Sequence, residues 1–106
     1  MNMTYTQMKE AIKRNVQEVD PQAEVYLYGS RARGDARGDS DWDVIVLTRA
    51  DHVSFKEEEK FMDHICDLIV DTGQTIQLFV YGSGEWHSLH AVTPFYQSVQ
   101  QEAVKI

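Results

Sequence analysis

Cysteine is nearly absent from the sequence, which contains Cys66 alone. A single cysteine cannot form a disulfide within the chain, so the fold must be held by its core rather than by covalent cross-links. A chain of this kind suits a reducing compartment, and we expect a cytoplasmic protein. Cys66 has apolar neighbours on a predicted helix, and we expect it to be a packed core thiol rather than a reactive one.

Long apolar runs are also missing. No segment approaches the roughly 20 consecutive apolar residues that a membrane-spanning helix needs. Residues 1–10 lack the apolar stretch behind a basic start that is typical of a secretory signal. We therefore expect no membrane partner, and the 42% apolar content suits a globular protein.

Positive charge is scarce in this chain. It has 10 Lys and Arg against 17 Asp and Glu, a formal net charge of −7. Binding to long nucleic acid needs a broad cationic surface, so this charge argues against such a partner. Yet Arg31, Arg33 and Arg37 lie within seven residues of one another. This local cationic spot on an acidic body suits a small anion.

The order of apolar patterns predicts one α+β domain, residues 1–106, in which a small mixed sheet is covered by helices. Helical spacing and β-rich runs alternate along the chain, and no linker interrupts them. Strands are expected at Val25–Tyr28, Val44–Leu47 and Thr75–Tyr81, and helices at residues 5–19, 54–73 and 93–106. The run Val44–Leu47 is apolar throughout, which is typical of a strand covered on both faces.

Asp41 and Asp43 stand two residues apart at the entry to the Val44–Leu47 strand. Strand side chains alternate between faces, so both carboxylates are expected to point the same way. Two like charges held side by side repel each other. A divalent cation such as Mg²⁺, which takes oxygen ligands, removes that repulsion. The pair therefore predicts a magnesium site.

Gly29-Ser30 leaves the first predicted strand and enters the basic stretch. A glycine turn that opens a short helix presents free backbone N–H groups and the positive end of a helix dipole. Ser30 can add a hydroxyl donor, and Arg31, Arg33 and Arg37 can approach other phosphate oxygens. For any single arginine, a solvent-facing charge paired with a nearby aspartate is an equal alternative. We predict a phosphate site at this turn.

Gly29-Ser30, ten further residues and then Asp41-Trp42-Asp43 resemble the G-S-x10-D-x-D signature of the DNA polymerase β-type nucleotidyltransferase superfamily. The short chain looks like its minimal nucleotidyltransferase (MNT) branch. The resemblance implies the nucleotidyltransferase fold and a domain that binds a nucleoside triphosphate with one or two Mg²⁺ ions. Such a domain transfers the nucleoside monophosphate, AMP from ATP being the expected case, to a protein or small acceptor.

The resemblance also implies roles for individual residues. Asp41 and Asp43 would be the catalytic residues and the metal ligands. The nucleotide would be bound by Gly29, Ser30, Arg31 and Arg33. The protein does little covalent work in such chemistry, and its part is mostly to position the reactants and to neutralise developing charge.

Active members of the superfamily usually carry a third carboxylate on a neighbouring strand. In this chain the Thr75–Tyr81 strand is the natural place, and it offers Gln77, whose amide carries no charge and cannot serve as a general base. Asp71 and Glu85 lie just outside that strand and are alternatives if the strand begins or bends differently. Whether catalysis survives with Gln77 is left open.

MNT domains are often half of a two-gene toxin–antitoxin pair, beside an all-helical HEPN ribonuclease. The resemblance then implies an antitoxin that neutralises a HEPN-type toxin by adenylylating it or, as the alternative, by binding it without catalysis. The acidic surface and two tryptophans expected to be exposed, Trp42 and Trp86, suit such an interface. The sequence leaves open the nucleobase, the acceptor and whether the protein forms an oligomer.

Overall fold

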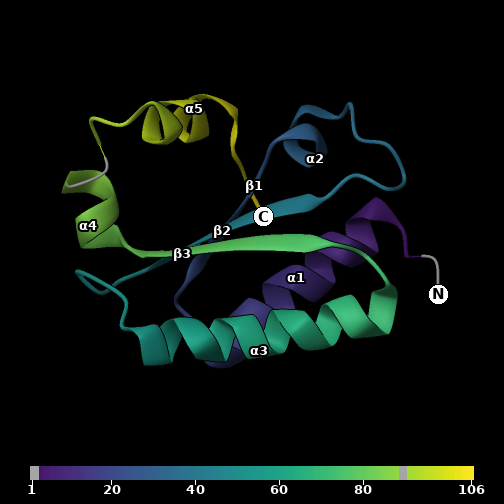
Figure 1. The fold of residues 1–106 in the computed structure, drawn as a ribbon, viewed down its shortest axis with the longest axis horizontal. Coiled ribbons are helices and arrows are strands. Elements are labelled where there is room, and N and C mark those ends of the chain that lie inside the picture. The colour runs from purple at the N-terminus through teal and green to yellow at the C-terminus, as the bar shows by residue number, and fades with distance from the viewer. Residues whose placement is uncertain (1–2, 89–90) are drawn as a thin grey trace.

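The computed structural model describes residues 3–88 and 91–106, which form a four-stranded sheet with helices on both faces (Figure 1). The strands are β1 (Glu24–Tyr28), β2 (Trp42–Thr48), β3 (Ile76–Gly82) and β4 (Val104–Lys105). The helices are α1 (Tyr5–Val19), α2 (Ser30–Arg33), α3 (Phe55–Thr72), α4 (Ser83–Ser88) and α5 (Pro94–Glu102). The three predicted strands are present, and so are the three predicted long helices.

The sheet is mixed and has the strand order β3-β2-β1-β4. β1 pairs antiparallel with β2 and with β4, whereas β2 pairs parallel with β3. The parallel pair is connected by α3, as a parallel pair requires a crossover. Val44, Ile45 and Val46 of the inner strand β2 are fully buried. The predicted α+β fold with a small mixed sheet is therefore confirmed.

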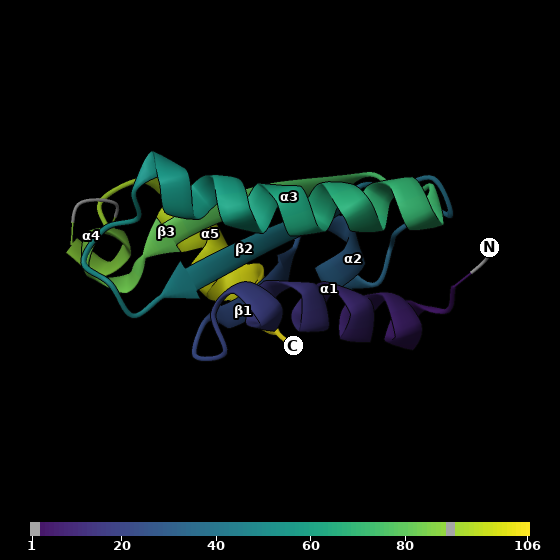
Figure 2. The same ribbon diagram turned by 90° about the horizontal axis from the view of Figure 1, so that it is seen from below.

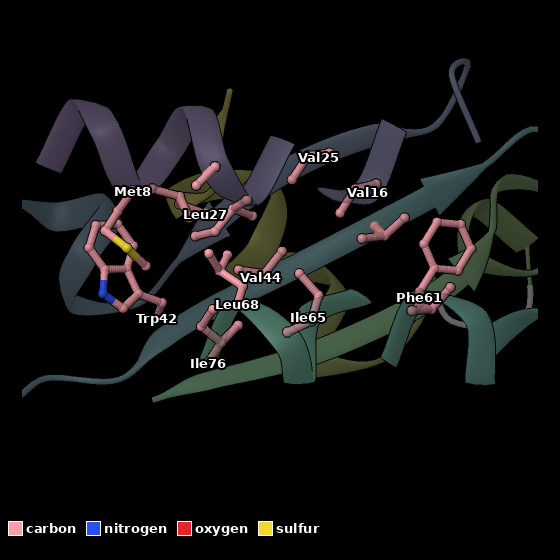
Figure 3. Packing of buried hydrophobic residues seen from close by; sticks show 14 of the residues in the cluster. Met8, Val16, Val25, Leu27, Trp42, Val44, Phe61, Ile65, Leu68 and Ile76 are labelled. Atoms are coloured by element: carbon pink, nitrogen blue, oxygen red, sulfur yellow. The ribbon is translucent and has the colours of Figure 1, made fainter. Parts of the chain in front are cut away.

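The main core lies between the sheet and two long helices, α1 and α3, which pack side by side on one face (Figure 2). Both helices and the strands contribute apolar side chains to it (Figure 3), among them Met8, Val16, Leu27, Trp42, Val44, Phe61 and Ile65. Each large side chain that is fully buried contributes roughly 1.5–3 kcal/mol to folding. This core fixes β1 and β2, the two strands that flank the charged segment.

The opposite face of the sheet carries a second, aromatic cluster under α4 and α5. Ile45 and Leu47 of β2 are buried there, and Phe95 of α5 packs on the same side. The Phe95 ring lies with its centroid 5.8 Å from that of Tyr28 and 5.6 Å from that of Phe79. Tyr28, the last residue of β1, brings this aromatic layer to the end of the sheet where β2 begins.

The long helices begin and end at residues that suit those positions. The side chains of Ser54 and Thr93 accept hydrogen bonds from backbone N–H groups three residues further on, so both residues cap their helices. Gly73 ends α3 with a φ of 71°, a conformation that favours glycine. None of the described helices is both long enough and apolar enough to cross a membrane.

The C-terminal residues differ from the prediction. α5 ends at Glu102, and Val104–Lys105 form the short strand β4 beside β1. The Lys105 ammonium donates to Glu24 Oε2 at 2.8 Å across this edge. The predicted helix to residue 106 is wrong here because two-residue strands have no period that a sequence pattern can display, while the open edge of β1 offers backbone partners.

Three side chains are placed differently from the predictions. Trp42 is 2% exposed and Trp86 is 0% exposed, so neither forms an exposed interface. Trp42 lies one position from both aspartates on a strand and therefore points to the opposite face, into the main core. Trp86 is covered by α5, where the centroid of the Tyr96 ring lies 5.0 Å from that of Trp86. Cys66 is exposed rather than packed, because it lies about 100° around α3 from the buried Ile65.

Candidate functional site

Gly29 turns the chain sharply at the end of β1. Its backbone has φ 75° and ψ −150°, a combination that only glycine adopts readily. Ser30 then begins α2, and the N–H groups of Ala32 and Arg33 each donate to the Gly29 carbonyl at 3.0 Å. The structure therefore has the glycine turn and the short helix that the sequence predicted.

Gly29 also lies against Asp43 on the adjacent strand. A Cβ atom at Gly29 would stand 2.6 Å from Asp43 Oδ2, closer than real side-chain contacts allow. The antiparallel register brings the two together, because Tyr28 is the cross-strand partner of Asp43. The backbone of the turn and the carboxylate thus occupy adjoining space with no side chain between them.

Asp43 belongs to a row of residues that crosses the sheet on the α5 side. Tyr28 is its partner on β1, and Gln77 is its partner on β3. Gln77 Nε2 donates a hydrogen bond of 3.1 Å to Asp41 Oδ2. Because Asp41 reaches the side chain that is paired with Asp43, the two carboxylates lie on the same side of the sheet, as the strand alternation predicted.

The electrostatics of this row favour a bound cation. Burial raises the pKa of the Asp43 carboxyl above its ordinary value, and the negative charge of Asp41 raises that pKa further. The positive charge of Arg33 acts in the opposite direction. Two carboxylates that repel each other in a partly buried place are stabilised when a cation approaches both.

Arg33 is the arginine that the structure brings within electrostatic reach of this pair. Its guanidinium lies 3.3 Å from the Asp35 carboxylate and 3.5 Å from that of Glu102 in α5. These carboxylates, Asp35 foremost, raise the pKa of Arg33. The Arg33 side chain is 48% exposed, and exposed ion pairs contribute little. Arg33 can therefore exchange these partners for a bound anion at small cost.

Arg31 points to the other side of β2. Its guanidinium lies over the Trp42 ring, 4.3 Å from the ring centroid, and Trp42 packs in the main core. The Arg37 side chain has neither a hydrogen bond nor an ion pair within residues 3–88 and 91–106. The three arginines that were predicted to approach phosphate therefore do not converge.

The donors at this site fit magnesium. Asp41 and Asp43 offer carboxylate oxygens and Gln77 offers an amide oxygen, which are ligands that Mg²⁺ accepts. In the described part of the chain, no group of three or more His, Cys, Asp or Glu side chains gathers around one point. A pair of carboxylates suits an ion that keeps water or phosphate oxygens as its other ligands, which is how proteins usually hold Mg²⁺.

Neither alternative for the third carboxylate joins the acidic pair. Asp71 belongs to α3, which covers the opposite face of the sheet. Glu85 follows β3, and because β3 runs parallel to β2, it lies past the far end of both strands. Its backbone N–H donates to Asp51 O at 2.7 Å there. The β3 residue that faces Asp43 is therefore Gln77, where the sequence placed it.

Two residues of this region were not predicted from the sequence. Tyr28 lies beside Asp43, and the antiparallel pairing of the two strands that flank the charged segment would have indicated it. Glu102 reaches Arg33 from α5, and no local pattern connects these distant positions. Tyr28 could therefore have been predicted from the sequence, whereas Glu102 could not.

Asp43→Asn tests the repulsion between the two carboxylates. In metal-free protein the ionised Asp43 opposes folding, because its pKa is raised in the folded state. This cost is present above the folded-state pKa and disappears as the pH falls below the unfolded-state value. We expect the variant to melt above wild type in EDTA at pH 7 and to match it near pH 3, by scanning calorimetry. The exposed loop variant Asp39→Asn is the control and should melt like wild type; a lower melting temperature for Asp43→Asn contradicts the repulsion.

Gly29→Ala tests the close approach of the turn to Asp43. The added Cβ meets both a φ of 75° and the Asp43 carboxylate, so we expect the free energy of unfolding to fall by about 2–5 kcal/mol in urea titrations. Gly34→Ala is the control for a positive φ without a close contact: its φ is 85° with a ψ of 10°, in the left-handed helical region, and nothing lies within 4 Å of its added Cβ. That control should lose only about 1–2 kcal/mol. Equal losses would show that no contact with Asp43 is involved.

Several solved structures share this fold. A toxin–antitoxin structure with AMP-PNP contains a chain with 21% sequence identity and a TM-score of 0.66, over 92% of this chain and 70% of that one. A double Asp-to-Glu variant of the toxin–antitoxin MntA–HpeT gives a TM-score of 0.60 at 17% identity, over 97% and 72% of the two chains. A Tyr-to-Ala variant of MntA–HpeT gives 0.58 at 18% identity, over 99% and 72%. At these identities the similarity establishes a common fold.

Two comparisons of the sequence bear on the family of this chain. The search of curated proteins found no match. Residues 7–90 match the family described as nucleotidyltransferase domain. This range covers most of the chain and contains the glycine turn, both aspartates and Gln77. The protein is therefore a member of the nucleotidyltransferase domain family.

Proposed function

We propose that this domain is a Mg²⁺-dependent nucleotidyltransferase that acts as the MNT antitoxin of a HEPN/MNT pair. It transfers a nucleoside monophosphate, AMP from ATP in the expected case, to a protein or small acceptor. The contact between Gly29 and Asp43, where a Cβ would lie 2.6 Å from Oδ2, carries this proposal. That contact joins a turn suited to anions with carboxylates suited to cations, and a magnesium-bound triphosphate needs both at once.

Each residue of the site has a role in this proposal. Asp41 and Asp43 hold the metal, Gly29 and Ser30 hold the outer phosphates, and Arg33 offsets the phosphate charge. When bound, Mg²⁺ supplies Lewis-acid polarisation of the phosphate. The acceptor oxygen forms a bond to the α-phosphorus, and the bond between the α-phosphorus and the oxygen that bridges it to the β-phosphorus breaks. Pyrophosphate leaves with that oxygen, and the acceptor's proton passes to water. Because the amide of Gln77 cannot take that proton, the protein contributes positioning and charge neutralisation.

The solved structures that share the fold support the choice of nucleotide and partner. Their descriptions name toxin–antitoxin complexes, one of them with the ATP analogue AMP-PNP. The net charge of −7 favours a protein or small acceptor over long nucleic acid. A nucleoside triphosphate as substrate and a chain without an internal disulfide suit the cytoplasm.

The position of Gln77 favours a second candidate, an antitoxin that neutralises a HEPN toxin by contact alone. Gln77 of β3 is the cross-strand partner of Asp43 in β2, and it donates a hydrogen bond of 3.1 Å to Asp41 Oδ2. A neutral amide at this place adds no charge for a second metal ion and no base for the acceptor. In this candidate the fold and nucleotide affinity remain, and transfer is weak or absent.

Labelling distinguishes the two candidates. The protein is mixed with ATP labelled on the α-phosphate, Mg²⁺ and the protein encoded by the adjacent gene, and we expect label on that partner. An Asp41→Asn, Asp43→Asn double variant should lower labelling at least about 100-fold, because the metal loses both charged ligands. An Asp63→Asn, Asp67→Asn double variant carries the same chemical change on the exposed side of α3 and should label normally.

Inhibition of the partner is measured in the same reactions. Loss of both labelling and inhibition in the Asp41→Asn, Asp43→Asn variant supports transfer as the mode of action. If inhibition survives in that variant, the antitoxin acts by contact alone. The same conclusion follows if wild type gives no label while still inhibiting its partner. The melting temperature of each variant excludes unfolding as the cause.

A further inference from the structure

Arg31 ties the loop between the glycine turn and the aspartates to the rest of the fold. Its Nη2 donates to the backbone carbonyl of Ser40 at 2.8 Å and to that of Gly38 at 3.4 Å. Ser40 is the residue directly before Asp41. For residues 36–40, the structure describes no other hydrogen bond to a different part of the chain, because the remaining bonds join Arg37 with Ser40 inside the loop itself.

The Arg31 guanidinium is itself held in place. It stacks on Trp42 at 4.3 Å from the ring centroid, and the Trp42 ring packs in turn against Tyr5 of α1 at a centroid distance of 5.4 Å. The Tyr5 hydroxyl donates to the Arg31 carbonyl at 2.7 Å. Arg31 Nε is buried and has no hydrogen-bond partner in the described structure. The stacking on Trp42 and the two bonds from Nη2 hold the guanidinium, and the Tyr5 bond holds the Arg31 backbone, so the residue can anchor the loop.

The Arg31 guanidinium lies on the main-core side of β2, whereas the acidic pair and the proposed substrate lie on the other side. Trp42 points into the main core beside Met8 (Figure 3). Asp43, the next residue of the strand, points to the opposite face. The Arg31 guanidinium on Trp42 therefore lies across the strand from the acidic pair, and its bonds to the backbone that leads into Asp41 connect it to the site.

We propose that Arg31 is a positioning residue: through the Ser40 and Gly38 carbonyls it fixes where Asp41 stands relative to Asp43, and so sets the affinity of the site for its divalent cation. This inference rests on the proposed function, since it assigns a role to Arg31 at that same site. It replaces the direct phosphate contact that the sequence predicted for Arg31.

The loss of the Arg31 anchor should weaken cation binding, because the anchor keeps residues 36–40 ordered. Without the anchor, residues 36–40 gain conformational freedom, and binding a cation must then order Asp41 as well. Residues that orient metal ligands typically change metal affinity by about 10–100-fold when they are replaced. A higher Mg²⁺ concentration offsets this loss, because Asp41 and Asp43 are both still present. A lost phosphate contact is not restored in this way.

The test measures the Mg²⁺ concentration that gives half-maximal binding of ATP, by calorimetry on the full chain. In Arg31→Gln we expect this concentration to rise at least about tenfold, while the ATP affinity at saturating Mg²⁺ stays within about threefold of wild type. Arg31→Lys keeps the positive charge but loses the planar stacking on Trp42 and the geometry in which one nitrogen reaches both carbonyls, and we expect an intermediate shift. Arg49→Gln, an exposed arginine just past the other end of β2, is the matched control and should shift nothing.

Other outcomes overturn the inference. An unchanged Mg²⁺ requirement in Arg31→Gln shows that the anchor is not needed, and a loss of ATP affinity that is equal at all Mg²⁺ concentrations shows a direct phosphate contact. If Arg31→Gln does not fold, Arg31→Lys decides by the same criteria. If wild type itself binds no ATP, the proposed function fails, and hydrogen exchange then decides on the anchor alone. Faster exchange at residues 36–41 in Arg31→Lys supports it, and unchanged exchange contradicts it.

Discussion

The structure of this site depends on one steric constraint, the packing of the Gly29 backbone against the carboxylate of Asp43. A Cβ at Gly29 would lie 2.6 Å from Asp43 Oδ2, and the turn has a φ that favours glycine for a second, independent reason. Any side chain here would separate the turn from the carboxylate. The constraint thus places donors for an anion beside ligands for a cation, and it links the shape of the fold to the chemistry proposed for it.

The sheet supplies the frame for this contact. Antiparallel pairing of β1 with β2 sets Tyr28 opposite Asp43, and parallel pairing of β2 with β3 sets Gln77 on the other side. α1 and α3 bury the reverse face, so the strand alternation sends Trp42 into the core and leaves the acidic pair on the α5 side. Asp41 and Asp43 lie at the edge of the core because β2, which the core holds in place, begins between these two residues. The same arrangement puts Arg31 behind the site, where it can hold the loop without contacting a substrate.

Local sequence patterns were sufficient for the strands, the long helices and the common orientation of Asp41 and Asp43, because alternation and helical spacing are properties of neighbouring residues. The same alternation also assigns Trp42 to the core, but the prediction that Trp42 is exposed did not apply the alternation to this residue between the two aspartates. Trp86 is buried by α5, and Arg33 meets Glu102, through contacts between distant segments. The side of β2 on which Arg31 lies and the strand at the C-terminus likewise depend on tertiary packing, which no local pattern contains.

The most direct test of the account is a crystal structure of the protein grown with Mn²⁺, in place of Mg²⁺, and a non-hydrolysable ATP analogue, with data collected at the manganese absorption edge. The account predicts an anomalous peak roughly 2.0–2.3 Å from carboxylate oxygens of both Asp41 and Asp43, since Mn²⁺ accepts the same oxygen ligands as Mg²⁺. It also predicts the outer phosphates at the Gly29–Ser30 backbone. A metal bound elsewhere, or a nucleotide whose phosphates lie away from this turn, would contradict it.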